Sequence, residues 1–563
     1  MLANRFSDRW TGIGIFACIS FVICIFRLSF LDKILLMATS AFLIFVVLTI
    51  KKTGFKSTFY SITSTEKKRA FLLILVLEVL TFCVLIIWKF SAYSHILSLF
   101  LKVLVFDLLG IFVAFVTFLR NKESIHKVYF ILGITLGLSL FAIIPVGVVP
   151  DEAMHIYSSY AVSNKMLGLN KMDNEDGILM RNCDSAFEFY TDQNYYNNDN
   201  YNKYIGAIDS QENIYTSSYF PCPYIQTNTY LYIIPAIGIT IGRVLNFNCI
   251  ETYLIARLLN LLFFVYMTAF AINKIKYGKI LLFTVALLPC TVQQGMAVTY
   301  DVPINLMFFL VFTYLVNSFY CNDQSLTILD KLLFALCSIG LILVKSHAYI
   351  FIAVLPIMLM LWRKIYSIVN KKIAYFTLML GIIGVVSIFA YYKLQPSISL
   401  SDTSYYTLGY LFQNPKEIFA VIYNTVVNTG SFYLDTFVGR YLGYLSISIH
   451  PFIIYMYYFV LIVSSCLKYD EKVLISKNEK FLFLLVSMIE TIAMLVGMLL
   501  ANSVISDHQV LGMQGRYLMP CILLMLFCFQ NNLLKVAKNR DSVVFGMLTA
   551  ISITTICNIM FVI

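Results

Sequence analysis

Asp151, Glu152 and His155 follow Pro150 directly after a long apolar run, and they form the sharpest cluster of chemically active residues in the sequence. If residues 151–165 form a helix, His155 lies one turn beyond the two acids on the same face. A low-dielectric boundary favours the protonated form of a carboxyl group, which suits a general base that takes a proton from a hydroxyl. The alternative is structural, because proline and acidic residues are both favoured in the first turn of a helix. We predict Asp151 and Glu152 as catalytic residues and His155 as a substrate-binding residue.

Asp301 and Asn305 form a second candidate site, at the start of another apolar run. Aspartate is a common N-cap, so a purely structural role is the alternative for Asp301. Asn305 lies one turn later, inside the run, and polar residues within membrane segments tend to be functional. We therefore predict that both residues bind substrate.

The tripeptide Gly-Arg-Tyr occurs twice, at residues 439–441 and 515–517. An arginine at a membrane surface can hold a phosphate through two parallel hydrogen bonds, and the glycine lets the backbone approach closely. The alternative is an arginine that only anchors a helix end, and it fits Arg440 equally well. The second copy follows an unusually polar segment. We predict a phosphate-binding set made of Arg516, Gln514, Arg440 and His508.

Lys345 stands with Ser346 and His347 in the turn of an otherwise apolar hairpin. This lysine could face the same phosphate, and a solvated turn explains the three residues equally well. The cysteines show no metal-ligand spacing, so the sequence predicts no particular cofactor. A divalent cation that assists the reaction is left open. Cys183 and Cys222 share one polar loop and could pair if that loop faces an oxidising compartment.

The elements that carry these residues are strongly apolar. Of the 563 residues, 60% are hydrophobic and only 13% are charged, and the mean hydropathy is +0.81. This excludes a soluble fold, because runs of about twenty apolar residues recur and each can span roughly 30 Å of hydrocarbon. We predict an all-α integral membrane protein with about 15 transmembrane helices. The expected crossings are residues 10–29, 33–50, 70–89, 97–119, 128–149, 252–272, 280–295, 302–319, 332–345, 348–361, 373–391, 451–467, 480–501, 516–533 and 542–562.

The net charge of +11 comes from lysines and arginines in short loops between apolar runs, which indicates the positive-inside pattern rather than binding to nucleic acid. With a cytoplasmic N-terminus, every basic loop falls on the cytoplasmic side only if residues 230–244 do not cross. We therefore predict an interfacial helix there. Two large polar loops, 150–229 and 394–450, then face the outside, and the first of them follows the fifth crossing.

Several of these motifs together resemble a family of bacterial polytopic membrane proteins known only as a domain of unknown function, which in turn resembles the GT-C superfamily of glycosyltransferases. The similarity covers about residues 128–540. Two departures stand out: Tyr444 and Ser446 occupy positions where the family usually shows Trp and Asp, and four crossings precede residue 125. The motifs that carry the resemblance are PDEAMH at 150–155 with Tyr157, the pair Asp301 and Asn305, LGYL at 442–445 before Pro451, and GMQGRY at 512–517 with Pro520.

The resemblance implies a multi-pass protein of the bacterial plasma membrane that takes a sugar from a polyprenyl-phosphate carrier on the extracytoplasmic face and passes it to a glycan or cell-wall polymer. In GT-C enzymes an acid in the first outer loop acts as base, which corresponds to Asp151 and Glu152 here. The implied partners are the lipid-linked donor, the polymer acceptor and the bilayer. The implied organisation is a four-helix extension at 1–125, a core at 126–540 with outer loops 150–229 and 394–450, and a C-terminal helix at 541–563.

Two other functions remain open from the sequence. A flippase or transporter for lipid-linked saccharides would place charges near the bilayer midplane, where few occur, the main ones being Glu78, Lys102 and Asp107. A surface polysaccharide polymerase or ligase would be expected to use arginines in its large outer loops. Arg181 is the arginine of the first large loop, and Arg440 that of the second.

Overall fold

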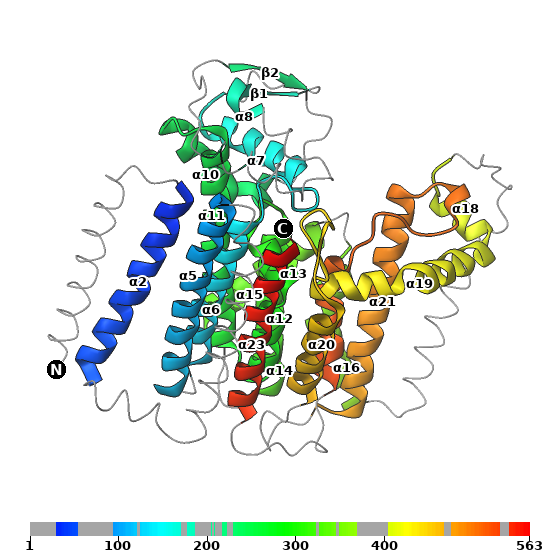
Figure 1. Cartoon of the computed structure of the whole chain (residues 1–563). Coiled ribbons are helices and arrows are strands. Elements are labelled where there is room, and N and C mark those ends of the chain that lie inside the picture. The colour runs from blue at the N-terminus through cyan, green and yellow to red at the C-terminus, as the bar shows by residue number, and fades with distance from the viewer. Residues whose placement is uncertain are drawn as a thin grey trace.

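The protein is a bundle of helices that run side by side, with shorter elements gathered at one end (Figure 1). A computed structural model describes residues 30–53, 94–120, 124–169, 177–185, 204, 206, 208, 217–221, 229–321, 326–344, 348–368, 404–466, 475–529 and 540–562. The predicted crossings at 10–29, 70–89 and 373–391 lie outside these residues.

Most of the predicted crossings that the structure describes coincide with a helix of the bundle. Six helices in the described part are long and apolar enough to cross a membrane, and the pair α12–α13, bent by 66° at its break, would make a seventh. The chain is therefore a helical membrane protein, and the count of 15 crossings stays a prediction. The bundle helices are α2 (Phe30–Thr53), α5 (Ser94–Arg120), α6 (Ile125–Ile143), α11 (Cys249–Lys274), α12 (Lys279–Ala286), α13 (Pro289–Met296), α14 (Asp301–Tyr320), α15 (Ile328–Leu343), α16 (Ile350–Ile368), α20 (Pro451–Cys466), α21 (Lys477–Asn502), α22 (Met519–Cys528) and α23 (Arg540–Val562).

The basic helix ends meet at one end of the bundle, at the bottom of Figure 1. There the Lys274 ammonium lies 2.9 Å from Asp330, and the Arg363 guanidinium lies 2.6 Å from Glu479. Asp330 and Glu479 also complete capping boxes that start α15 and α21. The charge rule assigns this end to the cytoplasm, which remains a prediction.

The opposite end carries the elements of the two large loops, together with the short helices at 229–244 and 505–518. The helix assumed for residues 151–165 is present from Glu152 onward. The stretch 394–450, expected as a polar loop, contains a helix of 24 residues, α19. The elements are α7 (Glu152–Met166), β1 (Gly177–Arg181), α8 (Asn182–Ser185), β2 (Ser217–Pro221), η3 (Thr229–Tyr232), α10 (Ile233–Val244), α18 (Leu408–Gln413), α19 (Pro415–Val438), β3 (Tyr441–Leu442), β4 (Ile447–Ser448), η5 (Ile505–Asp507) and η6 (Gly515–Leu518).

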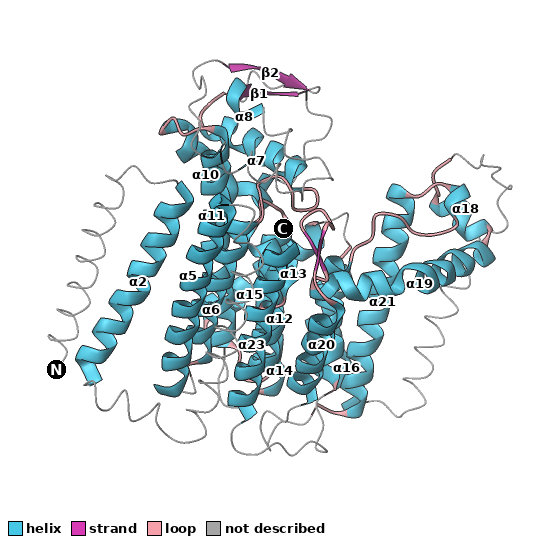
Figure 2. Ribbon diagram, in the orientation of Figure 1, coloured by secondary structure: helices cyan, strands magenta, loops and turns pink. Residues whose placement is uncertain are grey.

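Strands β1 and β2 form an antiparallel pair above α7, drawn in magenta in Figure 2. The pair is tied to the helix by hydrogen bonds rather than by a core of its own. The Asn164 side chain donates to the Leu179 carbonyl at 3.0 Å, and the Tyr160 hydroxyl donates to Asp184 at 2.8 Å. Asp184 also forms a buried ion pair with Arg181, whose Nε lies 2.6 Å from Asp184 Oδ2. These bonds fix α7 in place, which is the helix that begins next to Asp151.

Helix α10 packs against α11 and α7 instead of running through the bundle. It has 12 residues, and with η3 it is among the apolar helices too short to span a membrane. This placement agrees with the interfacial helix predicted at 230–244. The close approach depends on Gly238, since a Cβ there would lie 2.5 Å from the Ala256 Cα of α11.

We expect Gly238→Ala to destabilise the protein, because the added methyl meets backbone atoms of α11 that cannot move aside. Overpacking of this kind typically costs about 1–3 kcal/mol. The measurement is thermal unfolding in detergent. Gly497→Ala in α21 is the matched control: nothing lies within 4 Å of its Cβ, so its melting temperature should be unchanged or slightly higher. Equal melting temperatures for both variants would contradict the packing described here.

Candidate functional site

Arg516 lies between two carboxylates from distant parts of the chain. Its Nη2 forms an ion pair with Asp151 Oδ2, across 365 residues of sequence. Its Nη1 donates to the Pro150 carbonyl at 3.1 Å, and its Nε lies 3.5 Å from Asp301 Oδ2. Three of the predicted site residues therefore meet in one cluster, which we call the Arg516 cluster: Asp151, Asp301 and Arg516.

The members of the Arg516 cluster differ in their access to solvent. The side chains of Arg516 and Asp301 are 5% and 8% exposed, whereas that of Asp151 is 48% exposed. With both acids ionised, two negative charges face one positive charge. Asp151 is therefore the member that can reach a ligand and change its partner at the lowest cost, because its carboxylate already contacts solvent.

Local backbone geometry points the two ends of the ion pair at each other. Asp151 has a left-handed conformation (φ 64°), which is uncommon for a residue other than glycine, and it directly precedes α7. Arg516 belongs to the 3-10 turn η6, just before α22. That turn is held by Gly515, whose N–H donates to the Thr436 hydroxyl of α19 at 2.9 Å.

Tyrosines and a histidine line the buried side of the cluster. The Tyr517 hydroxyl accepts from Arg516 Nη2 at 2.9 Å. His155 Nδ1 lies 2.9 Å from the Tyr232 hydroxyl, and its ring meets that of Tyr300 edge-on with centroids 4.4 Å apart. Burial, with the neighbouring Asp301 charge, raises the pKa of Tyr300. His155 thus packs α7 against η3 and the start of α14, beside the acids.

Glu152 has a different environment from Asp151, although the sequence predicted the same role for both. It is fully buried in an ion pair with Arg257 of α11, with Nε and Nη2 at 2.7 and 2.5 Å. Backbone N–H groups of Gly147 and Val298 donate to its two oxygens. All its acceptor positions toward the protein are in use, so the geometry favours a structural role for Glu152 over a catalytic one.

The remaining predicted residues lie outside the ion pairs of the Arg516 cluster. Arg440 pairs with Asp435 at 2.6 Å, and this hydrogen bond raises the pKa of Arg440. His508 is largely exposed, with Nδ1 3.3 Å from Glu417. Asn305 is buried on α14 one turn after Asp301, and Gln514 is half-buried beside Gly515. Lys345 and Cys222 lie outside the described residues, so neither the phosphate contact nor the disulfide is tested.

Two groups at the site were missed from the sequence. Arg257 stands inside an apolar run, and an arginine in that position is a signal in the sequence for a buried partner. Tyr517 belongs to the Gly-Arg-Tyr motif, whose tyrosine was given no role from the sequence, and its hydroxyl accepts from Arg516. Both residues hold the acids or the arginine in position.

Comparison with known families places the chain. A family model described as "Predicted membrane protein (DUF2142)" matches residues 134–525. The chain belongs to this family. No curated protein and no solved structure matches the chain significantly. The DUF2142 match includes every residue of the Arg516 cluster, and its description supports a membrane protein without naming an activity.

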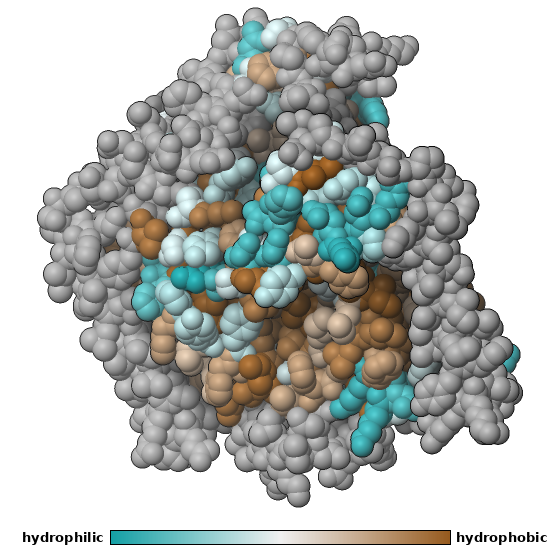
Figure 3. Space-filling model, turned by 90° about the vertical axis from the view of Figure 1, so that its right-hand side faces the viewer, coloured by the Kyte–Doolittle hydropathy of each residue, from teal (hydrophilic) through white to brown (hydrophobic). Residues whose placement is uncertain are grey.

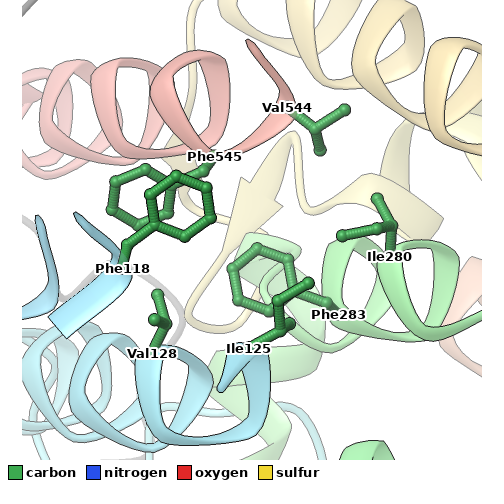
Figure 4. A pocket seen from close by; sticks show the side chains of 7 residues that line it. All are labelled: Phe118, Ile125, Val128, Ile280, Phe283, Val544 and Phe545. Atoms are coloured by element: carbon green, nitrogen blue, oxygen red, sulfur yellow. The ribbon is translucent and has the colours of Figure 1, made fainter. Parts of the chain in front are cut away.

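Two other features of the described part of this DUF2142 protein bear on where chemistry could occur, the metal-ligating side chains and a pocket. Among the described residues, no three His, Cys, Asp or Glu side chains gather closely enough to hold a metal ion. The pocket in Figure 4 is lined by apolar side chains alone, so it offers no group for chemistry. Its lining residues are Phe118, Ile125, Val128, Ile280, Phe283, Val544 and Phe545.

We expect Glu152→Ala and Arg257→Ala each to lower the free energy of unfolding by about 3–5 kcal/mol, because each leaves a buried charge without its partner. Thermal unfolding in detergent and the amount of protein in the membrane measure this. Asp151→Asn is the matched control at the neighbouring position: the half-exposed amide can still accept from Arg516, which keeps Asp301 as a charged neighbour, so its stability should change much less. Wild-type stability of the Glu152 and Arg257 variants would contradict the structural role assigned to this pair.

Proposed function

We propose that this protein is a glycosyltransferase that uses a polyprenyl-phosphate-linked sugar and modifies a cell-surface glycan or polymer on the extracytoplasmic face of the bacterial plasma membrane. The observation that carries the proposal is the contact between Asp151 and Arg516. A cation suited to a phosphate and an acid suited to a hydroxyl proton lie side by side, at the end of the bundle opposite the basic helix ends.

Arg516 is the proposed phosphate ligand. A planar guanidinium can donate two parallel hydrogen bonds to phosphate oxygens. Arg516 Nη2 donates one hydrogen bond to Asp151, its most exposed partner. An incoming phosphate can take this donor without disturbing the Pro150 carbonyl or the Tyr517 hydroxyl.

Asp151 is the proposed base, released from Arg516 as the phosphate binds. The acceptor hydroxyl gives its proton to the Asp151 carboxylate while its oxygen forms a bond to the anomeric carbon. The bond between that carbon and the phosphate oxygen breaks, and polyprenyl phosphate leaves with the electron pair. Arg516 stabilises the charge on the leaving phosphate. Asp301 keeps the guanidinium oriented through its contact with Nε at 3.5 Å.

A flippase for lipid-linked saccharides is the second candidate, and one observation favours it. Helices α12 and α13 form a span broken by a bend of 66°, and transporters build their binding sites on discontinuous helices. Buried amide side chains, Gln293 and Gln294, follow the break. The Gln293 oxygen accepts from the Gly443 N–H at 2.7 Å, so this one supports the hairpin β3–β4.

The first test measures surface glycan in cells that carry Asp151→Asn or Arg516→Ala. We expect sugar transfer to fall by roughly 100-fold or more for each, the size typical of losing a general base or a charge-stabilising group. Arg363→Gln is the matched control, because it removes an arginine–carboxylate pair at the other end of the bundle and should leave the glycan unchanged. Unchanged glycan in both site variants, at normal protein levels, would end the transferase proposal.

A second test separates the two candidates. Purified protein in detergent micelles should release polyprenyl phosphate from a polyprenyl-phosphate sugar in the presence of acceptor glycan, because sugar transfer needs no sealed compartment. A flippase would show no chemistry in micelles but would move the lipid-linked saccharide across the membrane of reconstituted vesicles. The second pattern would replace the transferase with the flippase.

A further inference from the structure

Helix α19 presents an apolar face that is exposed among the residues the structure describes. Five large apolar residues on it are between 52% and 75% exposed. Their spacing of three, four and seven residues places them along one side of a helix. We call this set the α19 stripe: Phe419, Tyr423, Val426, Val427 and Leu434.

The opposite side of α19 holds the segment that leads to Arg516. The Thr425 hydroxyl accepts from the Val510 N–H at 2.9 Å, and the Thr436 hydroxyl accepts from the Gly515 N–H at 2.9 Å. At 100° per residue, Thr425 lies about 200° around the helix from Val427. The two faces are therefore distinct, one bound to the 503–515 segment and the other open.

Gly515 makes the contact with α19 unusually close. A Cβ at this position would lie 2.0 Å from the Tyr433 carbonyl oxygen and 2.3 Å from the Phe437 nitrogen. The backbone of η6 thus rests directly on the backbone of α19, one residue before Arg516. Any displacement of α19 must displace the Arg516 turn as well.

The α19 stripe lies next to an exposed apolar face of α20, the helix that follows it in the bundle. Helix α20 exposes Phe452, Tyr455, Phe459 and Ile462 along one side. The two helices are joined where the Tyr458 hydroxyl donates to the Leu434 carbonyl at 2.7 Å. In Figure 1 α19 lies across the direction of α20 and α21. On the face shown in Figure 3, hydrophilic residues gather above a broad hydrophobic surface.

We propose that α19 is an interfacial helix whose stripe lies in bilayer lipid, and that it fixes the depth at which Arg516 is held relative to the membrane surface. A helix that is apolar on one side and lies across the bundle is suited to the boundary between headgroups and acyl chains. Tyr423 is of an aromatic type that is enriched at this level, and Phe419 is typical of the apolar face of such helices. The occupant is lipid because the five side chains of the stripe are uncharged and lie next to the outward face of α20. The exposed Lys416, one turn before Phe419 on the same side, can extend its ammonium to the headgroups.

The test places a single tryptophan on the stripe. Trp10, Trp88 and Trp362 are replaced by phenylalanine, Tyr423→Trp or Val427→Trp is added, and the protein is reconstituted into phosphatidylcholine vesicles with phospholipid brominated near the headgroup or in mid-chain. We expect lipid bromine near the headgroup to remove most of the fluorescence, and mid-chain bromine to remove less. Leu511→Trp, on the segment held by the other face, is the control and should be quenched by aqueous iodide instead.

The outcomes are independent of sugar transfer, because the readout is fluorescence alone. Quenching of both stripe positions by iodide would mean that the stripe faces water, and quenching by neither agent would mean that protein covers it. Either result would overturn the proposal.

A second experiment tests the coupling between α19 and the Arg516 turn. In the Tyr423→Trp background, Gly515→Ala should shift the balance between shallow and deep quenching, whereas Gly497→Ala should not. Thr436→Val removes the hydroxyl that accepts from Gly515 and donates to the Phe432 carbonyl, and it adds no bulk at the contact. It should cause a smaller shift of the same kind, and an unchanged balance in both variants would refute the coupling to Arg516.

Discussion

The buried ion pair between Glu152 and Arg257 is the constraint on which the rest of the site depends. In the low-dielectric interior, each charge must be matched and each remaining donor or acceptor satisfied. Arg257 therefore also donates to the Ile144 and Pro145 carbonyls, while Glu152 accepts from Gly147 and Val298. These bonds join the end of α6, the start of α7, α11 and the segment before α14 at a single point.

Two adjacent acids acquire opposite environments because a helix begins between them. Glu152 is the first residue of α7 and turns into the bundle, whereas Asp151 precedes the helix in a left-handed conformation and turns toward solvent. The buried pair holds the turn before α7 in place through its hydrogen bonds to the backbone of residues 144–147. The exposed acid is then free to exchange Arg516 for another ligand, which is the property that the proposed chemistry requires.

The two Gly-Arg-Tyr motifs use the same local geometry for different neighbours. In each, the guanidinium lies about 5 Å from the ring of the following tyrosine and pairs with an aspartate. Gly439 packs on α13, as Gly515 packs on α19. In one copy the aspartate is local, Asp435, and in the other it is Asp151, 365 residues earlier in the chain. The repeated tripeptide thus places an arginine close to a helix in both copies, and the two arginines differ in the aspartate with which they pair.

The sequence by itself determined the features that depend on local hydropathy and spacing. These are the membrane class, the helix that starts at Glu152, the short helix at 233–244 and the gathering of polar candidates at one end of the apolar segments. Only the tertiary structure decided which charges meet. Glu152 and Arg257 are 105 residues apart, and Asp151 and Arg516 are 365 apart. The different environments of the two acids and the pairing of His508 with Glu417 depend on such distant partners, which no local pattern encodes. The open face of α19 likewise depends on which neighbours cover the helix.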